Sequence, residues 1–332
     1  MTDLRIGVLG AARITPTALI APARQLDGVT VTAVAARDRE RAAAFAARHG
    51  IARVFDDYAA VVTDPDIDAV YVPLPNGLHA PWVLEAVAAG KHVLCEKPFT
   101  SNTTQAREIA DAVDARRRTG HAVTVMEAFH YRYHPLAARM REIVDTDLGA
   151  VGSVETTMCI PLPRFSDIRY QYDLAGGAMM DTGCYAMHVA RLLGPGEPVV
   201  AGARARLLRR DSRIDRAMTV TLAYPTGATG VVRTSMWSTN LLRVAVRVTG
   251  ERGTLSVLNF VAPQLFHRIT VRVSNSRRHE KSIGEATYTH QLRAFVAAVR
   301  GDPTNLTPPS DSIATMTLID AAYEAAGLPL RI

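Results

Sequence analysis

The chain has 332 residues, 48% of them hydrophobic and 21% charged, with a formal net charge of +6. This length predicts two domains, and the composition excludes a disordered chain. The sequence has no apolar run of about 18 residues, so we expect no membrane-spanning helix. The positive net charge is mild, and the sequence has neither a nucleic-acid recognition motif nor aromatic residues interleaved with basic ones. We therefore expect no nucleic-acid partner.

The cysteine usage indicates a reducing environment. Cys95, Cys159 and Cys184 lie far apart and form no C-x-x-C motif, which argues against both a disulfide framework and a thiolate metal site. The first residues run directly into a predicted strand and lack a secretory pattern. We therefore expect a cytoplasmic protein.

Strands and helices alternate over the first 126 residues, which is typical of βαβ units around a parallel sheet. Helices are expected to end at Gly50 and Gly90, because glycine adopts the left-handed conformation that closes a helix. The predicted strands cover residues 5–9, 29–35, 54–55, 69–73, 92–95 and 123–126, and the predicted helices begin near residue 16 and cover 39–49, 58–63, 80–89 and 103–118.

The pattern changes after about residue 150 to strands separated by turns, which indicates a mostly antiparallel sheet of about six strands. These strands are expected over residues 151–161, 198–208, 218–224, 230–238, 242–250 and 253–259, with one helix over 179–193 and a final pair over 289–300 and 310–326. The fold class is thus α/β: an N-terminal doubly wound parallel sheet of the Rossmann type, residues 1–125, and a C-terminal α+β domain with an open, mostly antiparallel sheet, residues 126–332.

The turn after the first strand resembles a dinucleotide-binding loop that has lost two glycines. In the pattern G-x-G-x-x-G, Gly10 holds the first position, Ala12 the second and Thr15 the third, with Arg13 and Ile14 between them. Ala12 still permits fairly close approach to a pyrophosphate. Taken alone, a plain strand-to-helix turn explains these residues equally well, so we predict the nucleotide site from the surrounding context.

The end of the second strand predicts the cofactor. An NAD site usually places an acid there to bind the ribose hydroxyls, but this chain has Ala36 followed by Arg37. A small residue with an arginine leaves room for a 2′-phosphate and supplies a cation for it. We therefore expect NADP as cofactor, with NAD possible because Asp38 could bind a ribose. The alternative is that Arg37 forms a surface ion pair with Asp38 or Glu40.

A lysine follows the fifth predicted strand, at residues 92–95. Pro98 cannot continue a central strand, so Glu96 and Lys97 are expected at the carboxyl end, where open α/β sheets bind their ligands. Only Lys91, Lys97 and Lys281 are lysines in this chain. Lysine can give up its proton in a crowded site, whereas arginine cannot, so Lys97 is a candidate for proton chemistry.

Three sequence blocks resemble the glucose–fructose oxidoreductase / inositol dehydrogenase (Gfo/Idh/MocA) family: residues 70–79, 89–98 and 176–185. Residues 126–135 also resemble its domain junction, and the tyrosine at position 185 is closest to the glucose–fructose oxidoreductase and dimeric dihydrodiol dehydrogenase branch. The resemblance implies a nicotinamide cofactor and hydride transfer to or from a secondary alcohol or aldose carbon. It also implies a homodimer or homotetramer built through the C-terminal sheet.

Hydride transfer from an alcohol needs a group that takes the hydroxyl proton. Tyr185 is the catalytic candidate, with a phenol whose usual pKa of about 10 a nearby Lys97 would lower. Asp181 precedes it by four residues and His188 follows it by three, so all three share one face of the predicted helix. We expect Asp181 to assist catalysis. His188 is a substrate candidate, although a satisfied structural histidine explains it as well.

The remaining site predictions depend on loops. We expect Pro75, Asn76, His79, Glu96 and Lys97 to lie beside the cofactor, and Arg132 to orient cofactor or substrate unless it forms a salt bridge. Arg164, Arg169 and Tyr172 are candidates for the substrate pocket. Glu127, His130 and His134 have ligand-like spacing, but the hydride mechanism needs no metal and we predict none.

The sequence therefore predicts an NAD(P)-dependent oxidoreductase acting on CH–OH groups. Its expected small-molecule substrate is a sugar, a polyol or a trans-dihydrodiol. Two alternatives stay open at this stage. One is a non-catalytic regulator that senses NADP on the same fold, and the other is a glycoside hydrolase that uses and regenerates its cofactor.

Overall fold

Six parallel strands form the sheet of the first half of the chain, in a computed structural model that describes residues 3–282 and 284–332. Their order is β3-β2-β1-β4-β5-β6, the order of a doubly wound dinucleotide-binding sheet. This confirms the fold predicted for this half. The strands are β1 (Leu4–Leu9), β2 (Val29–Ala35), β3 (Arg53–Phe55), β4 (Ala69–Val72), β5 (His92–Cys95) and β6 (Val125–Glu127).

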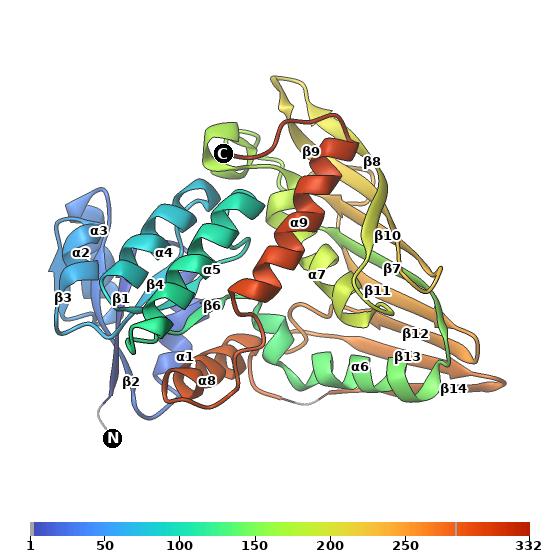
Figure 1. Cartoon of the computed structure of the whole chain (residues 1–332), viewed down its shortest axis with the longest axis horizontal. Helices are drawn as coiled ribbons and strands as arrows, with labels where there is room; N and C mark the ends of the chain where they lie inside the picture. The colour runs from blue at the N-terminus through green and yellow to red at the C-terminus, as the bar shows by residue number, and fades with distance from the viewer. Residues whose placement is uncertain (1–2, 283) are drawn as a thin grey trace. The chain divides into compact units, whose positions relative to one another are not determined.

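Helices connect these strands and begin and end largely where the sequence predicts. Asp38, Asp57 and Asn102 cap α2, α3 and α5, and Gly50 ends α2 in the left-handed conformation with φ 72°. α4 and α5 lie side by side over the sheet (Figure 1). The helical elements are η1 (Pro16–Ile20), α1 (Ala21–Ala23), α2 (Arg39–His49), α3 (Tyr58–Thr63), η2 (Asn76–Leu78), α4 (His79–Ala88) and α5 (Thr103–Arg118).

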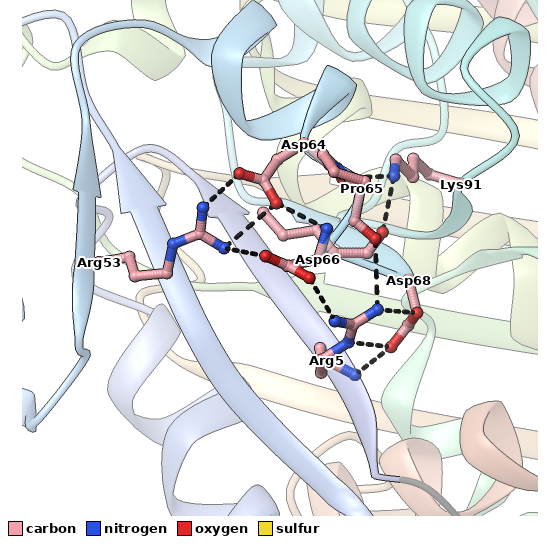
Figure 2. Close-up of polar contacts among 8 residues, drawn as sticks. Arg5, Arg53, Asp64, Pro65, Asp66, Asp68 and Lys91 are labelled. Carbon is pink, nitrogen blue, oxygen red and sulfur yellow. Dashed lines mark hydrogen bonds and ion pairs between the residues drawn. The ribbon is translucent and has the colours of Figure 1, made fainter.

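A charge network at the amino ends of the strands stabilises this sheet. Arg5 in β1 pairs with Asp66 at 3.0 Å and with Asp68 at 2.9 Å, and Arg53 in β3 pairs with Asp64 (Figure 2). Buried Lys91 donates from Nζ to the carbonyl oxygens of Asp64, at 2.6 Å, and Ile67, at 2.7 Å. Lys91 therefore holds the loop before β4, at the end of β5 opposite to Lys97.

Residues from late in the chain complete the first compact unit. Its contacts join the residues up to His130 with Tyr288–Ile313, and the second unit comprises Tyr131–Thr287 and Ala314–Ile332. α8 (Thr287–Val299) thus belongs almost wholly to the first unit, where Thr124 Oγ1 donates to Ala298 O at 3.4 Å. The domain boundary between residues 125 and 126 stays a prediction.

The second unit is built on a mixed, mostly antiparallel sheet, as predicted, but with eight strands instead of about six. Its order is β14-β13-β12-β11-β7-β10-β9-β8, and within it only the pair β7–β10 is parallel. The strands are β7 (Val151–Cys159), β8 (Val199–Leu208), β9 (Asp211–Ala223), β10 (Thr229–Ser235), β11 (Arg243–Gly250), β12 (Gly253–Leu258), β13 (Arg268–Val273) and β14 (Ser276–Glu280).

Three elements of this unit escaped the prediction. β13 and β14 form a hairpin, and β14 reads Ser-Arg-Arg-His-Glu, without any apolar residue to mark it as a strand. α6 (Pro135–Asp147) was not predicted, although a proline stands at its first position. Proline is tolerated at the first position of a helix, and the ring nitrogen Nδ1 of His134 caps this one by accepting from Leu136 N at 3.1 Å.

Two helices cover one face of the eight-stranded sheet. α7 (Cys184–Leu193) packs on β7 and β10, and α6 packs on β12 and on α7 (Figure 1). The one-turn element η6 (Met179–Gly183) precedes α7 directly, so the predicted helix over 179–193 is confirmed with a π-helical first turn. α9 (Pro309–Ala325) follows near the end of the chain.

An acidic shift of pH is expected to weaken the attachment of β14. Glu280 accepts hydrogen bonds from Arg139, at 2.8 and 2.9 Å, and from Arg278, at 2.8 Å, and these bonds lower its pKa to about 2. The unfolded chain binds this proton more readily, so the contribution is complete above the ordinary glutamate pKa and disappears as the pH falls toward about 2. Urea unfolding of Glu280→Gln should therefore lose less stability than the parent between pH 5 and pH 3; equal losses would contradict this.

Among the described residues no helix is long and apolar enough to cross a membrane. Cys95, Cys159 and Cys184 are all buried and free, as the absence of a disulfide framework requires.

Candidate functional site

The turn after β1 is shaped for close approach of a ligand. Gly10 has φ 110°, and its amide donates to Ala35 O at 2.7 Å, which ties the turn to the tip of β2. A Cβ on Gly10 would lie 3.1 Å from Leu74 Cδ2, so a larger residue would be strained there. Thr15, at the third glycine position, is fully buried, and its hydroxyl has no hydrogen-bond partner among the described residues. A compact backbone turn with an unsatisfied buried donor fits a bound nucleotide.

The exposed side chains of this turn lie where the prediction expects the cofactor. Arg13 and Ile14 are both exposed, Ile14 to 37%, whereas Ala12 is half-buried. Ala12 N donates to Gly10 O at 2.9 Å, so the turn is closed by its own backbone. The assignment of these residues to cofactor binding stays a prediction.

Arg37 lies at the carboxyl tip of β2, exposed, directly after the buried Ala36. Asp38 is engaged as the cap of α2, because it accepts from Arg41 N at 3.1 Å. Within the described ranges, Arg37 forms no ion pair with Asp38 or Glu40. The surface-pair alternative is therefore not what the structure shows, and the guanidinium remains available to an anion.

A second arginine joins Arg37, and the sequence reading missed it. Nη2 of Arg41 donates to Ala11 O at 2.8 Å, which places its charge against the turn after β1. The positive charges of Arg37 and Arg41 both act on the Tyr58 hydroxyl, although burial dominates and raises the pKa of Tyr58. The sequence could have indicated that Arg41 lies near Arg37, because Arg41 is in the first turn of the helix that follows Arg37.

The ends of β4 and β5 form the second part of the site. His79 is fully buried, and its ring nitrogens lie 2.8 Å from Pro98 O and 2.8 Å from Leu74 O. It thus connects the loop that carries Lys97 with the loop that carries Pro75 and Asn76. Burial, with a smaller contribution from Lys97, lowers the pKa of His79 to about 4, so the ring is neutral at pH 7. Its predicted contact with the cofactor stays untested.

Glu96 and Lys97 leave β5 where the prediction puts them. Oε1 of Glu96 accepts from the hydroxyl of buried Tyr71 at 2.7 Å. The charge of Lys97 reaches a second buried histidine, His130, whose pKa falls to about 3, chiefly because of burial. His130 stacks on Tyr288 with ring centroids 4.1 Å apart. The charge of Lys97 therefore acts on two buried histidine rings; no local signal in the sequence pointed to Tyr288.

The residues with metal-like spacing have structural uses. Glu127 Oε1 accepts from Phe99 N at 2.9 Å, His134 caps α6, and His130 stacks on Tyr288. Over residues 3–282 and 284–332, no three His, Cys, Asp or Glu side chains are grouped to hold a metal ion.

In the second unit, η6 and α7 carry the other catalytic candidates. Asp181 accepts from Arg169 Nε at 3.0 Å, and Arg169 also binds Asp167 at 3.1 Å. Tyr185 is 6% exposed, and its ring centroid lies 6.1 Å from that of Tyr131. The structure thus brings Arg169 to Asp181, a pairing that the sequence did not predict.

His188 and the loop candidates take separate places. His188 Nδ1 lies 2.5 Å from the Tyr131 hydroxyl, so within the second unit it is a buried, satisfied histidine. Arg132 lies half-buried in η3 (His130–Tyr133) and forms no ion pair with a described residue. Exposed Arg164 donates to Ser166 Oγ at 3.4 Å, and the Tyr172 hydroxyl donates to Leu330 O at 2.5 Å.

These features define a class of protein with two units. One is a doubly wound dinucleotide-binding unit with a lysine at a strand end, and the other is built on an open, mostly antiparallel sheet. Residues 4–125 match the oxidoreductase family with an NAD-binding Rossmann fold, and residues 137–256 match the GFO/IDH/MocA C-terminal domain. The chain belongs to the GFO/IDH/MocA oxidoreductase family, as its sequence blocks predicted, and it is an NAD(P)-dependent oxidoreductase.

Named relatives resemble the chain over nearly its whole length. It is 38% identical to D-xylose 1-dehydrogenase (NADP(+)) 2 of Haloferax volcanii, over 97% of both proteins. It is 35% identical to dTDP-3,4-didehydro-2,6-dideoxy-alpha-D-glucose 3-reductase of Streptomyces violaceoruber, over 90% of this chain and 85% of the relative. Among solved structures, KijD10, a 3-ketoreductase from Actinomadura kijaniata in complex with NADP and TDP-benzene, covers 98% of both chains with TM-score 0.87 and 28% identity.

Proposed function

We propose that this enzyme oxidises the anomeric carbon of a free aldose with NADP, and that a pentose such as D-xylose is its first candidate substrate. The observation that carries this proposal is the 38% identity, over 97% of the chain, with a relative named D-xylose 1-dehydrogenase (NADP(+)). NADP as cofactor agrees with that relative, with the ketoreductase solved with NADP, and with the two arginines at the tip of β2.

In the proposed reaction C1 of the sugar loses two electrons and a proton as a hydride, and the C1 hydroxyl loses its proton; a nicotinamide held at this site would be the hydride acceptor. Tyr185 takes this proton when the aldose becomes a lactone, and returns it in the reverse reaction. Lys97 supplies the positive charge that favours the phenolate over a phenol with a usual pKa of about 10. Asp181, which Arg169 orients at 3.0 Å, positions the sugar.

The cofactor would be held by the first unit. The turn at Gly10 (φ 110°), with Ala12, Arg13 and Ile14, would hold the pyrophosphate, and Arg37 with Arg41 would hold the 2′-phosphate. Pro75, Asn76, His79 and Glu96 complete the nicotinamide side in this proposal, and Arg132 is assigned to the cofactor from the second unit. When bound, the nicotinamide supplies the hydride acceptor that no amino-acid side chain can provide.

A substrate panel tests the proposal. Purified protein is assayed with NADP⁺ and with NAD⁺ against pentoses, hexoses, inositols and trans-dihydrodiols, and the absorbance of the reduced nicotinamide is followed. We expect the largest kcat/KM for an aldose with NADP⁺, with a lactone as product. Oxidation of inositols or dihydrodiols alone would reject the aldose assignment.

A second substrate class has its own support. Several relatives are named 3-reductases of a dTDP-3,4-didehydro sugar, and the solved ketoreductase binds TDP-benzene. If a nucleotide-linked keto sugar is the substrate, NADPH is consumed with that compound and free aldoses are inert. Should NADPH bind without turnover of any of these compounds, the regulatory alternative gains, whereas glycoside cleavage without net change in NADPH would indicate the hydrolase.

The open sheet is also proposed to join two copies of this chain. A hollow of about 530 Å³ on this sheet is lined by residues of β7, β10, β11, β12 and β13, among them the exposed Leu258. Glu155 and Arg233, which also line this hollow, form an ion pair of 3.2 Å. Light scattering should give at least a dimer, and Leu258→Arg should shift it toward monomer; a monomeric parent protein would refute this.

A further inference from the structure

The glycine pair before η6 has a tight packing environment that the proposed chemistry leaves unexplained. Gly177 has φ 135°, and a Cβ there would lie 2.2 Å from Asp215 Oδ1, 2.8 Å from the Tyr323 hydroxyl and 2.9 Å from Arg331 Nη2. A Cβ on Gly176 would lie 2.6 Å from Arg169 O. The backbone at Gly176 and Gly177 is therefore closely packed against its neighbours, immediately before the residues proposed to act on the substrate.

Asp215, Tyr323 and Arg331 form one cluster, which we call the Asp215 cluster. Asp215 and Arg331 are both fully buried and form an ion pair of 2.9 Å. Oδ1 of Asp215 also accepts from the Tyr323 hydroxyl at 3.0 Å, and the Arg331 guanidinium lies 3.9 Å from the centre of the Tyr323 ring. Burying two charges is costly unless their partners are well placed, so this cluster has a defined geometry.

The same cluster holds the start of the helix. Oδ2 of Asp215 accepts from Met179 N at 2.7 Å, the first residue of η6, where a carboxylate is favoured by the helix dipole. Arg331 Nε donates to Gly176 O at 2.7 Å. Asp181 and Tyr185 follow two and six positions after Met179 on the same continuous helical segment.

An irregularity in the sheet turns Asp215 inward. In the pairing of β8 with β9, Leu207 lies opposite Asp215 and Arg206 opposite Ala217, so Arg216 has no partner in the ladder. As a result Ile214 and Asp215, which are adjacent, are both fully buried. Bulges of this kind re-aim a side chain, and here the bulge delivers a carboxylate to the end of η6.

We propose that the ion pair between Asp215 and Arg331 is a positioning device that fixes the helix carrying Asp181 and Tyr185. This inference rests on the proposed function, because it assumes that these two residues act on the substrate. Asp215 and Arg331 touch neither substrate nor cofactor in this proposal. They act through Gly176, Gly177 and Met179 on the direction of the helix.

The test compares Arg331→Met and Asp215→Asn with Arg139→Met, which removes another ion pair of the same unit, between α6 and β14. Hydrogen–deuterium exchange of peptides over residues 176–190 should quicken about tenfold or more in the first two variants and stay unchanged in Arg139→Met. With the best substrate of the panel, kcat should fall about tenfold to a hundredfold in the first two variants, since small misplacements of reacting groups have such effects. The Kd of NADPH should stay within about twofold.

Further variants separate the possible failures. Arg331→Lys keeps the charge but cannot bond both Asp215 and Gly176 in the planar geometry of a guanidinium. It replaces Arg331→Met if that variant does not fold. We expect the same faster exchange over residues 176–190 as in Arg331→Met. Guanidinium chloride, but not sodium chloride, should partly restore kcat in Arg331→Ala. If Tyr185→Phe keeps full activity, the proposed mechanism fails. If Tyr185→Phe is inactive while folded Arg331→Met matches the parent in exchange and kcat, only the positioning role is refuted.

Discussion

Replacing Lys97 with alanine is expected to lower kcat by about two to four orders of magnitude while NADPH still binds, which is the usual range for losing acid–base assistance. Lys97 follows β5 at the carboxyl edge of the parallel sheet, and its charge acts on the neutral rings of His79 and His130. Steady-state kinetics with the best substrate of the panel, together with fluorescence titration of NADPH, measures both quantities.

Lys91 provides a matched control at the other end of β5. Its ammonium bonds the carbonyl oxygens of Asp64 and Ile67, which are part of the charge network and not of the proposed site (Figure 2). Lys91→Ala should therefore lower the Tm, because two carbonyl groups, that of Ile67 buried, lose their donor, and leave kcat nearly unchanged. Near-normal turnover in Lys97→Ala would remove the central catalytic assignment.

A double-mutant cycle examines whether Lys97 and Tyr185 serve one step. Tyr185→Phe removes the phenolic hydroxyl and keeps the ring, so it is the smallest change that abolishes proton transfer. If both residues act in the same step, kcat of the double variant should be scarcely lower than kcat of the more impaired single variant. Fully additive losses would mean that the two residues have separate roles.

The second large effect is expected at the tip of β2. Arg37→Ala should weaken NADP⁺ binding by about 1–3 kcal/mol, the cost of a charge-assisted bond to phosphate, and should affect NAD⁺ much less. Arg41→Ala should act in the same direction, because Arg41 lies against the turn after β1 through its bond to Ala11 O, at 2.8 Å. The ratio of kcat/KM for the two cofactors is the measurement.

Arg39 supplies the control for this pair. It lies between Arg37 and Arg41 in the chain, but it forms an ion pair with Asp56 on the surface. Arg39→Ala should therefore leave the preference between NADP⁺ and NAD⁺ unchanged. Equal weakening of both cofactors by Arg37→Ala would disprove the 2′-phosphate assignment.

Local signals made most of the fold predictable. Caps such as Asp38 and Asn102, and the left-handed Gly50, act within one turn of the helix that they start or end, so the sequence carries them directly. β14 shows the limit, because its residues are polar and it exists only as the partner of β13. α6 was not predicted, although Pro135 stands at the first helical position, where proline is tolerated.

The candidate site shows the same difference between positions that local sequence indicates and contacts that depend on distant residues. The positions of Gly10, Arg37, Glu96 and Lys97 could be predicted because each follows a strand, and parallel strands bring their carboxyl ends to one edge of a sheet; their roles stay a prediction. Arg41, Tyr288 and the pairing of Arg169 with Asp181 could not, because each depends on a side-chain direction or on a partner distant in the chain.

By itself, therefore, the sequence determined the family, the two kinds of sheet, the nicotinamide cofactor and the strand end at which Lys97 lies, since motifs and periodicity express these locally. Only the tertiary structure decided that His79 joins two loops through their carbonyl groups, and that Asp215 meets Arg331 beneath Gly177. The physical reason is that a buried polar group must find its partner wherever the fold places one, and sequence separations as long as 116 residues carry no trace of that choice.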